Sequence, residues 1–396
     1  MLCVNLTLIV VFKRTETHMK KILLVFGTRP EAIKMAPLVK AFQAEQQAFE
    51  TKVCVTGQHR EMLDQVLSLF DITADFDLKV MQPNQDLYDI TSNILIGMKA
   101  VFKAYRPDFV FVHGDTTTTL TASLAAFYEK ISVAHIEAGL RTGNIYAPWP
   151  EEANRKLTSQ ITRYHFAPTV QSRDNLLKEN VAADSIIVTG NTVIDALLLM
   201  KNKLETDSIF CAGVFETIKQ KGFDPKIAEF ILVTGHRREN FGQGFIDICT
   251  ALKTIALAKP HINIVYPVHL NPNVSLPVND LLAEVSNIYL IEPLQYEAFI
   301  YLMSLAKLII TDSGGVQEEA PSLGKPVLVL RDSTERPEAV TTGTVKLVGT
   351  DTQRIIRETN NLLDNPEAYE LMTKAHNPYG DGKACVRIIN FMRNLK

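Results

Sequence analysis

The strongest structural signal in this sequence is an apolar run that turns on two glycines, Leu308-Ile309-Ile310-Thr311-Asp312-Ser313-Gly314-Gly315-Val316-Gln317-Glu318-Glu319. Its first residues favour a buried β-strand, and the residues from Val316 onward suit the first turn of a helix. The first N–H groups of a helix lack partners, and glycine lets an anion approach the backbone closely. The stretch therefore predicts a phosphate site in which Ser313 caps the helix and Glu319 accepts hydrogen bonds from a ribose. An ordinary capped turn is the alternative, because short glycine-rich turns are weak motifs.

Predicted strands alternate with predicted helices on both sides of this stretch. Such alternation is typical of parallel, doubly wound sheets. A chain of 396 residues is also too long for one compact core. We therefore predict the α/β fold class, with two doubly wound domains that face each other across a cleft. The predicted strands are 21–26, 52–56, 109–112, 132–136 and 186–189 in the first half, and 230–234, 262–267, 288–291, 307–311 and 327–330 in the second.

The domain boundaries follow from this pattern. The first domain is predicted to span residues 19–190 and to be completed by a C-terminal helix within 378–396. The second domain is predicted to span 191–377. Residues 201–226 are the least patterned part of the chain, and we interpret them as the approach to the second domain.

The N-terminal segment precedes a clear strand-forming start at Met19. Its apolar run, 2–12, is too short to cross a bilayer. The run also lacks the preceding positive charge and the cleavage site of a signal peptide. We therefore predict that 1–18 is a non-native or disordered extension, with a weak membrane tether as the alternative.

Composition narrows the possible partners and compartments. The formal net charge of −3 gives no electrostatic reason to expect a nucleic-acid or membrane partner, so an anionic substrate requires a local basic site. The five cysteines are scattered and never spaced as CxxC, which argues against a disulfide framework and favours the reducing cytoplasm. No spacing of ligand residues indicates a metal, and no glycine motif indicates NAD.

Ligands of open α/β sheets bind beyond the carboxyl ends of the strands. In the first half, Arg29 and Lys34 flank a helix start, where Arg29 suits a phosphate and solvated surface charge is the alternative. Asp115, Glu137 and Glu151 stand at other strand ends or helix starts, and we predict acid/base roles for them. Helix capping is the alternative for Asp115, and a favourable charge at a helix start is the alternative for Glu151. Partial burial is expected to raise the pKa of Glu137.

In the second half, His236 follows a predicted strand and is joined by Arg237 and Arg238. This trio supplies the local basic site, and a histidine there suits protonation of a leaving phosphate. A structural role is the alternative for His236, and it is the favoured interpretation of His269. Arg336 lies in a predicted loop after the last predicted strand, where it could contact phosphate or sugar.

Short motifs in a fixed order carry a family resemblance. They are FGTRPEAIK at 26–34, QHREML at 58–63, HGDTTT at 113–118, IEAGLR at 136–141, PEEANR at 150–155, GHRREN at 235–240 and DSGGVQEE at 312–319. With these motifs, the chain from about Lys20 to the C-terminus closely resembles the bacterial non-hydrolysing UDP-N-acetylglucosamine 2-epimerases.

The resemblance implies a fold of glycosyltransferase-B type, with two Rossmann-like domains. It implies reversible interconversion of UDP-GlcNAc and UDP-ManNAc, through elimination of UDP to a 2-acetamidoglucal and re-addition. Such a reaction needs no metal or nicotinamide cofactor, and it supplies ManNAc units for cell-envelope polysaccharides. The resemblance also implies a cytoplasmic homodimer that a second UDP-GlcNAc activates.

Residue roles implied by the resemblance fall into three groups. Asp115, Glu137 and Glu151 are acid/base candidates, with the base for the C2 proton left open, and His236 assists the leaving phosphate. The implied substrate-binding residues are Arg29, Lys34, Asp115, Glu137, His236, Phe299, Ser313, Gly314, Gly315, Glu319 and Arg336. The implied activator-binding residues are Gln58, Glu61, Arg237 and His269.

Three other functions compete with this interpretation. A hydrolysing epimerase would release ManNAc and UDP, but the motif at 58–63 favours the non-hydrolysing type. A glycosyltransferase of the same fold would need an acceptor. A non-catalytic sensor of nucleotide sugars would need no base, and three carboxylates beside His236 argue against it.

Overall fold

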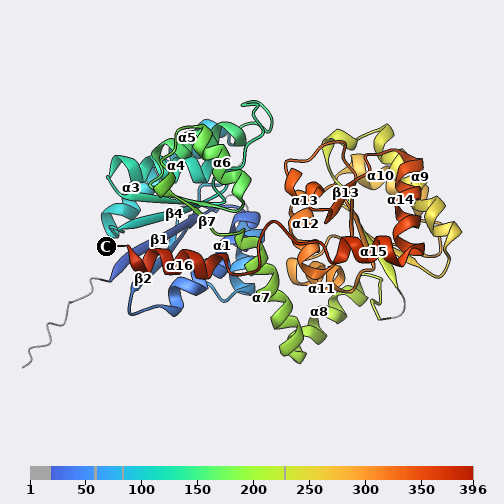
Figure 1. The fold of residues 1–396 in the computed structure, drawn as a ribbon. Coiled ribbons are helices and arrows are strands. Elements are labelled where there is room, and N and C mark those ends of the chain that lie inside the picture. Colours follow the sequence, from blue (N-terminus) through green and yellow to red (C-terminus); the bar gives the residue numbers. More distant parts are fainter. Residues whose placement is uncertain (1–18, 58–59, 83, 227–228, 396) are drawn as a thin grey trace, which may run out of the picture.

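The computed structural model describes residues 19–57, 60–82, 84–226 and 229–395. The chain forms two lobes, each built on a parallel sheet with helices on both faces (Figure 1). The predicted extension 1–18 and the predicted activator residue Gln58 lie outside the described residues. The predicted α/β class with two Rossmann-like domains is confirmed.

The first sheet has seven strands in the order β3-β2-β1-β4-β5-β6-β7. The strand order reverses between β1 and β4, which is where ligands bind in doubly wound sheets. Its strands are β1 (Lys20–Phe26), β2 (Phe49–Val55), β3 (Phe76–Asp77), β4 (Phe109–His113), β5 (Ser132–Ile136), β6 (Tyr164–Ala167) and β7 (Ile186–Val188). Its helices are α1 (Arg29–Ala44), α2 (Arg60–Leu69), α3 (Leu87–Ala104), α4 (Thr117–Tyr128), α5 (Glu151–Ile161) and α6 (Val170–Lys178).

The second sheet repeats this plan with six strands in the order β10-β9-β8-β11-β12-β13. Its order reverses between β8 and β11. Its strands are β8 (Phe230–Thr234), β9 (Asn263–Pro267), β10 (Ile288–Ile291), β11 (Leu308–Thr311), β12 (Val327–Val329) and β13 (Val345–Leu347). The helices from the domain junction onward are α7 (Thr192–Thr206), α8 (Ser208–Gln220), α9 (Gln243–Ala258), α10 (Pro272–Leu282), α11 (Tyr296–Leu305), α12 (Gly314–Glu319), α13 (Pro337–Thr341), α14 (Thr352–Asp364), α15 (Pro366–Thr373) and α16 (Ala384–Asn394).

Burial on both faces explains why the central strands read as unbroken apolar runs. In β1, Ile22 and Leu24 pack into the core on one side of the sheet, whereas Leu23 and Val25 pack into the core on the other. Successive side chains of a strand point to opposite faces, so a strand covered on both sides must be apolar at every position. Each such side chain contributes roughly 1.5–3 kcal/mol of burial.

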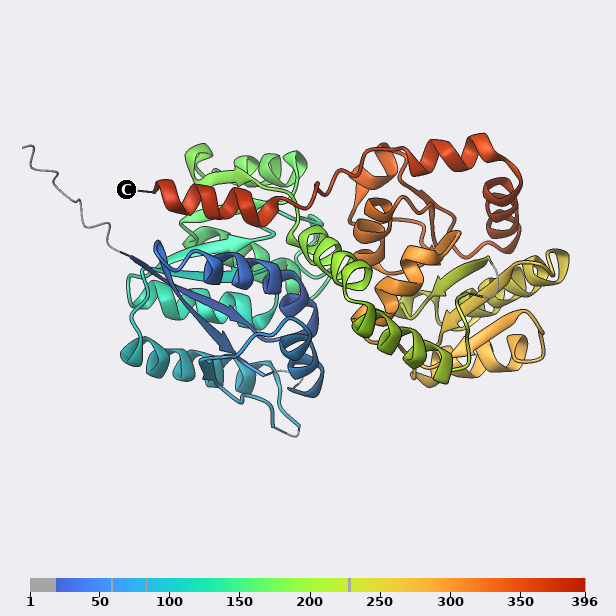
Figure 2. The ribbon, with the colours of Figure 1, turned by 90° about the horizontal axis from the view of Figure 1, so that it is seen from below.

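The chain crosses between the domains twice, and the two crossings touch. Gly190 and Gly380 lie against each other, with φ of +89° and +130° that side chains rarely allow. The Asn191 N–H donates to the Tyr379 carbonyl at 2.7 Å. After the second crossing, α16 lies along the first domain (Figure 2), where Phe391 packs edge-on against two aromatic rings of β6. The junction between the domains is therefore a paired, glycine-containing connection.

Some elements differ from the sequence prediction. Residues 201–226 are largely helical: α7 extends to Thr206, and α8 covers Ser208–Gln220. The short strands β3, β6 and β13 and the helix α6 were not predicted. Because β13 follows it, Arg336 precedes a further strand rather than following the last one. Strands of two to four residues carry too little periodicity to be recognised without their neighbours.

Candidate active site

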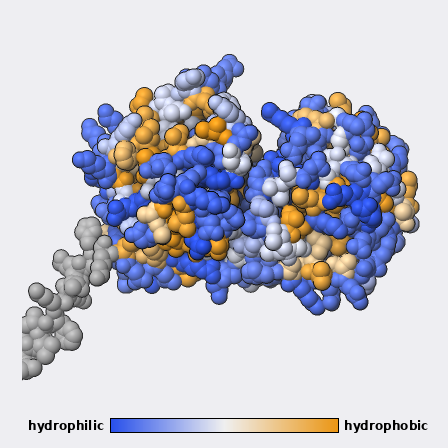
Figure 3. Space-filling view, turned by 45° about the horizontal axis from the view of Figure 1, so that its top comes forward, coloured by the Kyte–Doolittle hydropathy of each residue, from blue (hydrophilic) through white to orange (hydrophobic). Residues whose placement is uncertain are grey.

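The surface is hollowed between the two domains (Figure 3). A cavity of about 430 Å³ lies there, lined by Arg29, Lys34 and neighbouring residues of α1 and by the turns after β8 and β11. The predicted substrate-binding residues that line it are Arg29, Lys34, His236, Phe299, Ser313, Gly315 and Glu319.

Glu31 fixes the turn that carries Arg29. This buried carboxylate accepts hydrogen bonds from the N–H of Thr28 at 2.8 Å and from the N–H before it at 2.9 Å. Its other oxygen accepts from the Thr116 hydroxyl at 2.5 Å. Burial raises the pKa of Glu31, and these hydrogen bonds oppose the rise. One side chain thus joins the turn after β1 to the turn that carries Asp115.

Glu137 ends β5 in a left-handed conformation, with φ of +61°. A non-glycine residue in this region stores backbone strain, which clusters at functional sites. Its buried carboxylate forms an ion pair with the Lys34 ammonium and accepts from the Asn191 amide at 2.9 Å. Burial alone would raise the pKa of Glu137, but the Lys34 ammonium lowers it well below its usual range. The predicted rise was wrong, because a single strand end does not reveal an ammonium from another helix.

Two buried histidines, one near Glu137 and one against the turn after β4, are neutral near pH 7. The His113 Nε2 lies 3.8 Å from the Glu137 carboxylate, and burial lowers the pKa of His113 to about 4. The His135 Nε2 lies 2.7 Å from the Gly114 carbonyl, and burial lowers the pKa of His135 to about 3. Because the carbonyl accepts, Nε2 of His135 carries the proton. Neither ring adds charge beside Glu137 near neutral pH.

Asp115 pairs with Arg155 of α5, with 2.9 Å between its Oδ2 and Nε. The helix cap of α4 is Thr116, so the capping alternative for Asp115 was wrong. Glu151 is half-buried at the first position of α5, and its side chain has no hydrogen-bond or ion-pair partner within the described ranges. The next residue, Glu152, is fully buried and holds Arg155 at 3.0 Å. Of these two neighbouring carboxylates, only Glu151 is left available to a ligand.

Asp312 orients the histidine of the second domain. Its Oδ2 accepts from the backbone N–H groups of His236 and Arg237, each at 2.8 Å. Its Oδ1 lies 3.5 Å from the His236 Nδ1. The His236 ring also stacks on His269, with centroids 5.5 Å apart. Desolvation lowers the pKa of His236, and the Asp312 charge opposes this.

The glycine turn differs from its prediction at one residue. The Ser313 side chain makes no capping hydrogen bond to α12, so the predicted cap was wrong. A Cβ at Gly314 would lie 2.6 Å from the Arg336 Nη1, so any other residue here would force the guanidinium to move. The guanidinium of Arg336 therefore lies directly against the turn. The first turn of α12 and the Ser313 hydroxyl remain available to a ligand.

Glu319 lines the cavity one turn into α12. Its Oε1 accepts from the Tyr296 hydroxyl at 3.0 Å. Burial, together with the adjacent Glu318, raises the pKa of Glu319 to about 7, against the effect of this hydrogen bond. Phe299, one turn further along α11, lines the same cavity.

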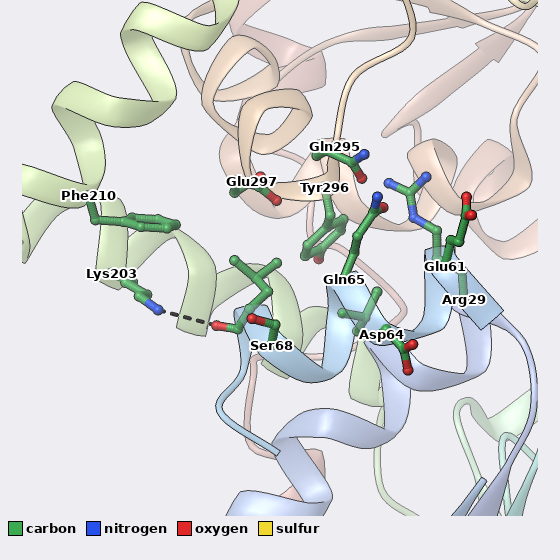
Figure 4. Close-up of a pocket in the computed structure, with 12 residues that line it drawn as sticks. Arg29, Glu61, Asp64, Gln65, Ser68, Lys203, Phe210, Gln295, Tyr296 and Glu297 are labelled. Atoms are coloured by element: carbon green, nitrogen blue, oxygen red, sulfur yellow. Dashed lines mark hydrogen bonds between the residues drawn. The ribbon is translucent and has the colours of Figure 1, made fainter. Parts of the chain in front are cut away.

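A second cavity, of about 720 Å³, adjoins the first through Arg29 and Tyr296. It lies between α2, the α7–α8 junction and α11, with Glu61 next to Arg29 at one end (Figure 4). The Lys203 Nζ donates to the Leu69 carbonyl at 3.2 Å at the other end. The predicted activator residues are thus divided between two places: Glu61 lines this cavity, whereas Arg237 and His269 lie beside His236.

The sequence prediction missed several residues that hold the site together. Asp312 and Glu318 lie inside the quoted glycine stretch, but the local sequence does not show whether their carboxylates are paired with other residues or exposed to solvent. Glu31 was identifiable, because Thr28-x-x-Glu31 is the pattern of a capping box. Asn191 carried no local signal, because both of its carboxylate partners come from distant turns.

Two searches of the described residues found no candidates. Within those ranges, no group of three or more His, Cys, Asp or Glu side chains is placed to hold a metal ion. None of the described helices combines the length and the hydropathy that a membrane span needs.

Two facing Rossmann-like domains with a shared cavity define a protein of glycosyltransferase-B type. The family model described as UDP-N-acetylglucosamine 2-epimerase matches residues 40–393. This chain belongs to that family, which is a family of isomerases, and the resemblance inferred from the motifs is confirmed.

Individual relatives are similar along nearly the whole chain. A UDP-N-acetylglucosamine 2-epimerase of Campylobacter jejuni is 61% identical over 373 residues, covering 94% of this chain and 97% of the relative. The enzyme of the same name from Escherichia coli is 60% identical over 374 residues, covering 94% and 98%. The crystal structure of UDP-GlcNAc 2-epimerase from Neisseria meningitidis bound to UDP-GlcNAc has a TM-score of 0.86 at 55% identity, covering 94% of this chain and 99% of that one.

Proposed function

We propose that this chain interconverts UDP-GlcNAc and UDP-ManNAc without hydrolysis. The observation that carries the proposal is one cavity with two chemically different walls. A glycine turn backed by Arg336 forms the wall of the second domain, and Lys34, which pairs with the buried Glu137 carboxylate, lines the wall of the first. The relative from Neisseria meningitidis was solved with UDP-GlcNAc, and one from Methanocaldococcus jannaschii with UDP-GlcNAc and UDP.

The second domain holds the nucleotide in this proposal. The turn at 313–315 binds the diphosphate through its N–H groups and the Ser313 hydroxyl, and Arg336 supplies positive charge. Glu319, held by Tyr296, accepts from the ribose hydroxyls. Phe299 lies beside the uracil through its backbone. UDP stays bound to these groups after its bond to the sugar has broken.

The first domain acts on the sugar. The C2 proton is weakly acidic, so a positioned carboxylate must remove it while UDP leaves with the electrons of the C1–O bond. A C1–C2 double bond forms, giving the 2-acetamidoglucal. Glu137, Asp115 and Glu151 are the candidates for the base and for the acid that returns a proton to the opposite face of C2. His236, oriented by Asp312, hydrogen-bonds the departing phosphate.

Further features belong to the proposal. No metal or nicotinamide takes part, since the elimination and re-addition need only acids, bases and charge stabilisation. The protein acts in the cytoplasm as a homodimer and supplies ManNAc units for cell-envelope polysaccharide. A second UDP-GlcNAc binds near the active site as an activator and is contacted by Gln58, Glu61, Arg237 and His269. The cavity that Arg29 shares with Glu61 supports a neighbouring site.

Incubation with UDP-GlcNAc in deuterated water tests the mechanism. We expect deuterium at C2 of both UDP-sugars, followed by mass spectrometry or NMR, because the removed proton exchanges with solvent. Accumulation of free ManNAc without UDP-ManNAc would instead identify a hydrolysing enzyme. Tight UDP-GlcNAc binding with no label at C2 would identify a sensor.

A further inference from the structure

We propose that Glu318 is a positioning residue that sets the orientation of Arg336 toward the diphosphate. This inference rests on the binding role proposed above for Arg336. Glu318 belongs to none of the substrate or activator groups, and it stands directly before Glu319, which lines the nucleotide cavity.

The carboxylate of Glu318 accepts a hydrogen bond from the Nε of Arg336. Glu318 is 1% exposed, and its Oε1 lies 2.6 Å from the Arg336 Nε. The Nη1 and Nη2 atoms of Arg336 lie 2.6 and 3.0 Å from the Cβ position of Gly314. The Cζ lies 2.7 Å from the same position, so the guanidinium lies face-on over Gly314. With Nε occupied by the carboxylate, the edge formed by the two Nη groups is left for the diphosphate. A guanidinium binds anions best along such a two-nitrogen edge.

Glu318 is itself held from several directions. Its Oε2 accepts from the Asn191 amide at 3.2 Å and lies 3.8 Å from the Lys34 Nζ. Its carbonyl accepts from the Asn377 amide at 2.9 Å. These partners come from α1 and from both interdomain connections, so the carboxylate has a defined position. A positioning role needs this rigidity.

The charges around the Glu318–Arg336 ion pair indicate where the guanidinium would move without Glu318. Arg336 and Lys34 lie among the carboxylates of Glu318 and Glu137 in this buried region. The charge of Glu137 acts on Arg336 as well, and the Glu335 Oε2 lies 3.6 Å from the Arg336 Nη1. Without Glu318, the guanidinium would be drawn toward Glu335 or Glu137, away from the diphosphate and, at Glu137, onto a carboxylate proposed for acid/base chemistry. Glu318 therefore keeps the phosphate-binding charge separate from Glu137.

The adjacent glutamate serves a different purpose. Successive residues of a helix point about 100° apart. Glu319 consequently faces the cavity and Tyr296, whereas Glu318 faces the domain junction. Substitutions at the two positions are expected to give different effects.

A mutant cycle with UDP as the probe tests the inference. We expect E318Q and R336Q each to weaken UDP binding roughly tenfold by titration calorimetry, since a charged hydrogen bond is lost in each case. The double variant E318Q/R336Q is expected to bind UDP no more weakly than R336Q alone, because Glu318 acts through Arg336. Uridine, which has no phosphate, should bind all three variants as it binds the wild type. E358Q removes a similarly buried carboxylate of α14, paired with Lys346, and serves as the control for folding.

Each outcome decides between distinct possibilities. Wild-type UDP binding by R336Q would refute the binding role of Arg336, and this inference with it. Weak binding by R336Q together with normal binding by E318Q would overturn this inference alone. A parallel loss of uridine and UDP affinity in E318Q would indicate a merely structural residue. Should E318Q be too unstable to measure, R336Q and E318Q/R336Q carry the test: equal UDP affinity supports the inference, and a further tenfold loss overturns it.

Discussion

Two strand–turn–helix units of this protein look alike in sequence and behave differently. The turn after β1 is closed by its own residues, because Thr28 and Glu31 form a reciprocal capping box at the start of α1. The turn after β11 has Ser313 at the equivalent position but Val316 three residues later, and no side chain caps α12. The capping box satisfies a helix start within the scaffold, and its absence leaves one open to an anion. The third residue of the helix thus separates a turn that its own side chains cap from a turn that no side chain caps.

The largest expected effect tests whether both halves of the site are needed. Asp115→Asn and Glu137→Gln in the first domain, and His236→Ala in the second, should each lower kcat by on the order of a hundredfold or more. Steady-state assay of UDP-GlcNAc turnover measures this, with circular dichroism as the check on folding. Near-normal rates in all three variants would refute the site assignment.

The next effect concerns Glu319, the buried carboxyl in the helix that follows the uncapped turn, and the pH dependence of stability. Burial raises the pKa of Glu319 to about 7 from a usual value of 4.5, so between these pH values the folded protein holds a proton that the unfolded chain has released. Stability conferred by this carboxyl is therefore lost as pH rises from 4.5 to 7. Glu319→Gln removes the titration.

Relative to wild type, Glu319→Gln should gain about 2 kcal/mol of unfolding free energy between pH 5 and pH 8. Denaturant unfolding of both proteins at the two pH values gives the difference. A difference that does not change with pH would show that Glu319 is ionised throughout.

Glycine substitutions separate the two turns more directly. Gly314→Ala should weaken UDP binding roughly tenfold while the protein stays folded, because a Cβ 2.6 Å from the Arg336 Nη1 would displace the end of that side chain from the turn. Gly27→Ala should instead lower the melting temperature, because its Cβ would meet the buried Thr56 hydroxyl at 2.0 Å. Calorimetry with UDP and thermal unfolding are measured on both variants. The reverse pattern would contradict the division of roles.

The smallest effect is expected from the two capping positions. Thr28→Ala removes a side-chain cap and should cost about 1 kcal/mol of unfolding free energy, with UDP affinity unchanged. Ser313→Ala removes a hydroxyl that caps nothing, so stability should hold while UDP affinity falls severalfold. Equal stability losses in both variants would show that Ser313 caps α12 in solution.

Much of the fold was predictable because its signals are local. The strand runs and helix starts around β1, β4, β8 and β11 depend on neighbouring residues alone, and all four strands lie within a residue of their predicted ends. β6 escaped prediction because Tyr164–Ala167 is short and contains a buried histidine, which only its partner strands make favourable. The candidate residues could be placed at strand ends from the sequence, because each motif directly follows a recognisable apolar run or begins a recognisable helix.

The charge state of the site was not predictable in this way. The expected rise in the pKa of Glu137 followed from burial, which is the effect a strand end suggests. Lys34 reverses it from 103 residues away. Glu318 reaches Lys34 across the domain junction and pairs with Arg336 within its own domain.

The sequence by itself determined two doubly wound sheets, the turns that end their strands and the family to which the chain belongs, because periodicity and motif order are properties of neighbouring residues. Only the tertiary structure decided which helix start is capped by side chains, which glutamate lines the cavity between the domains and which carboxylates are paired. Those properties depend on distances between groups far apart in the chain, and electrostatic energies in a buried site depend steeply on such distances.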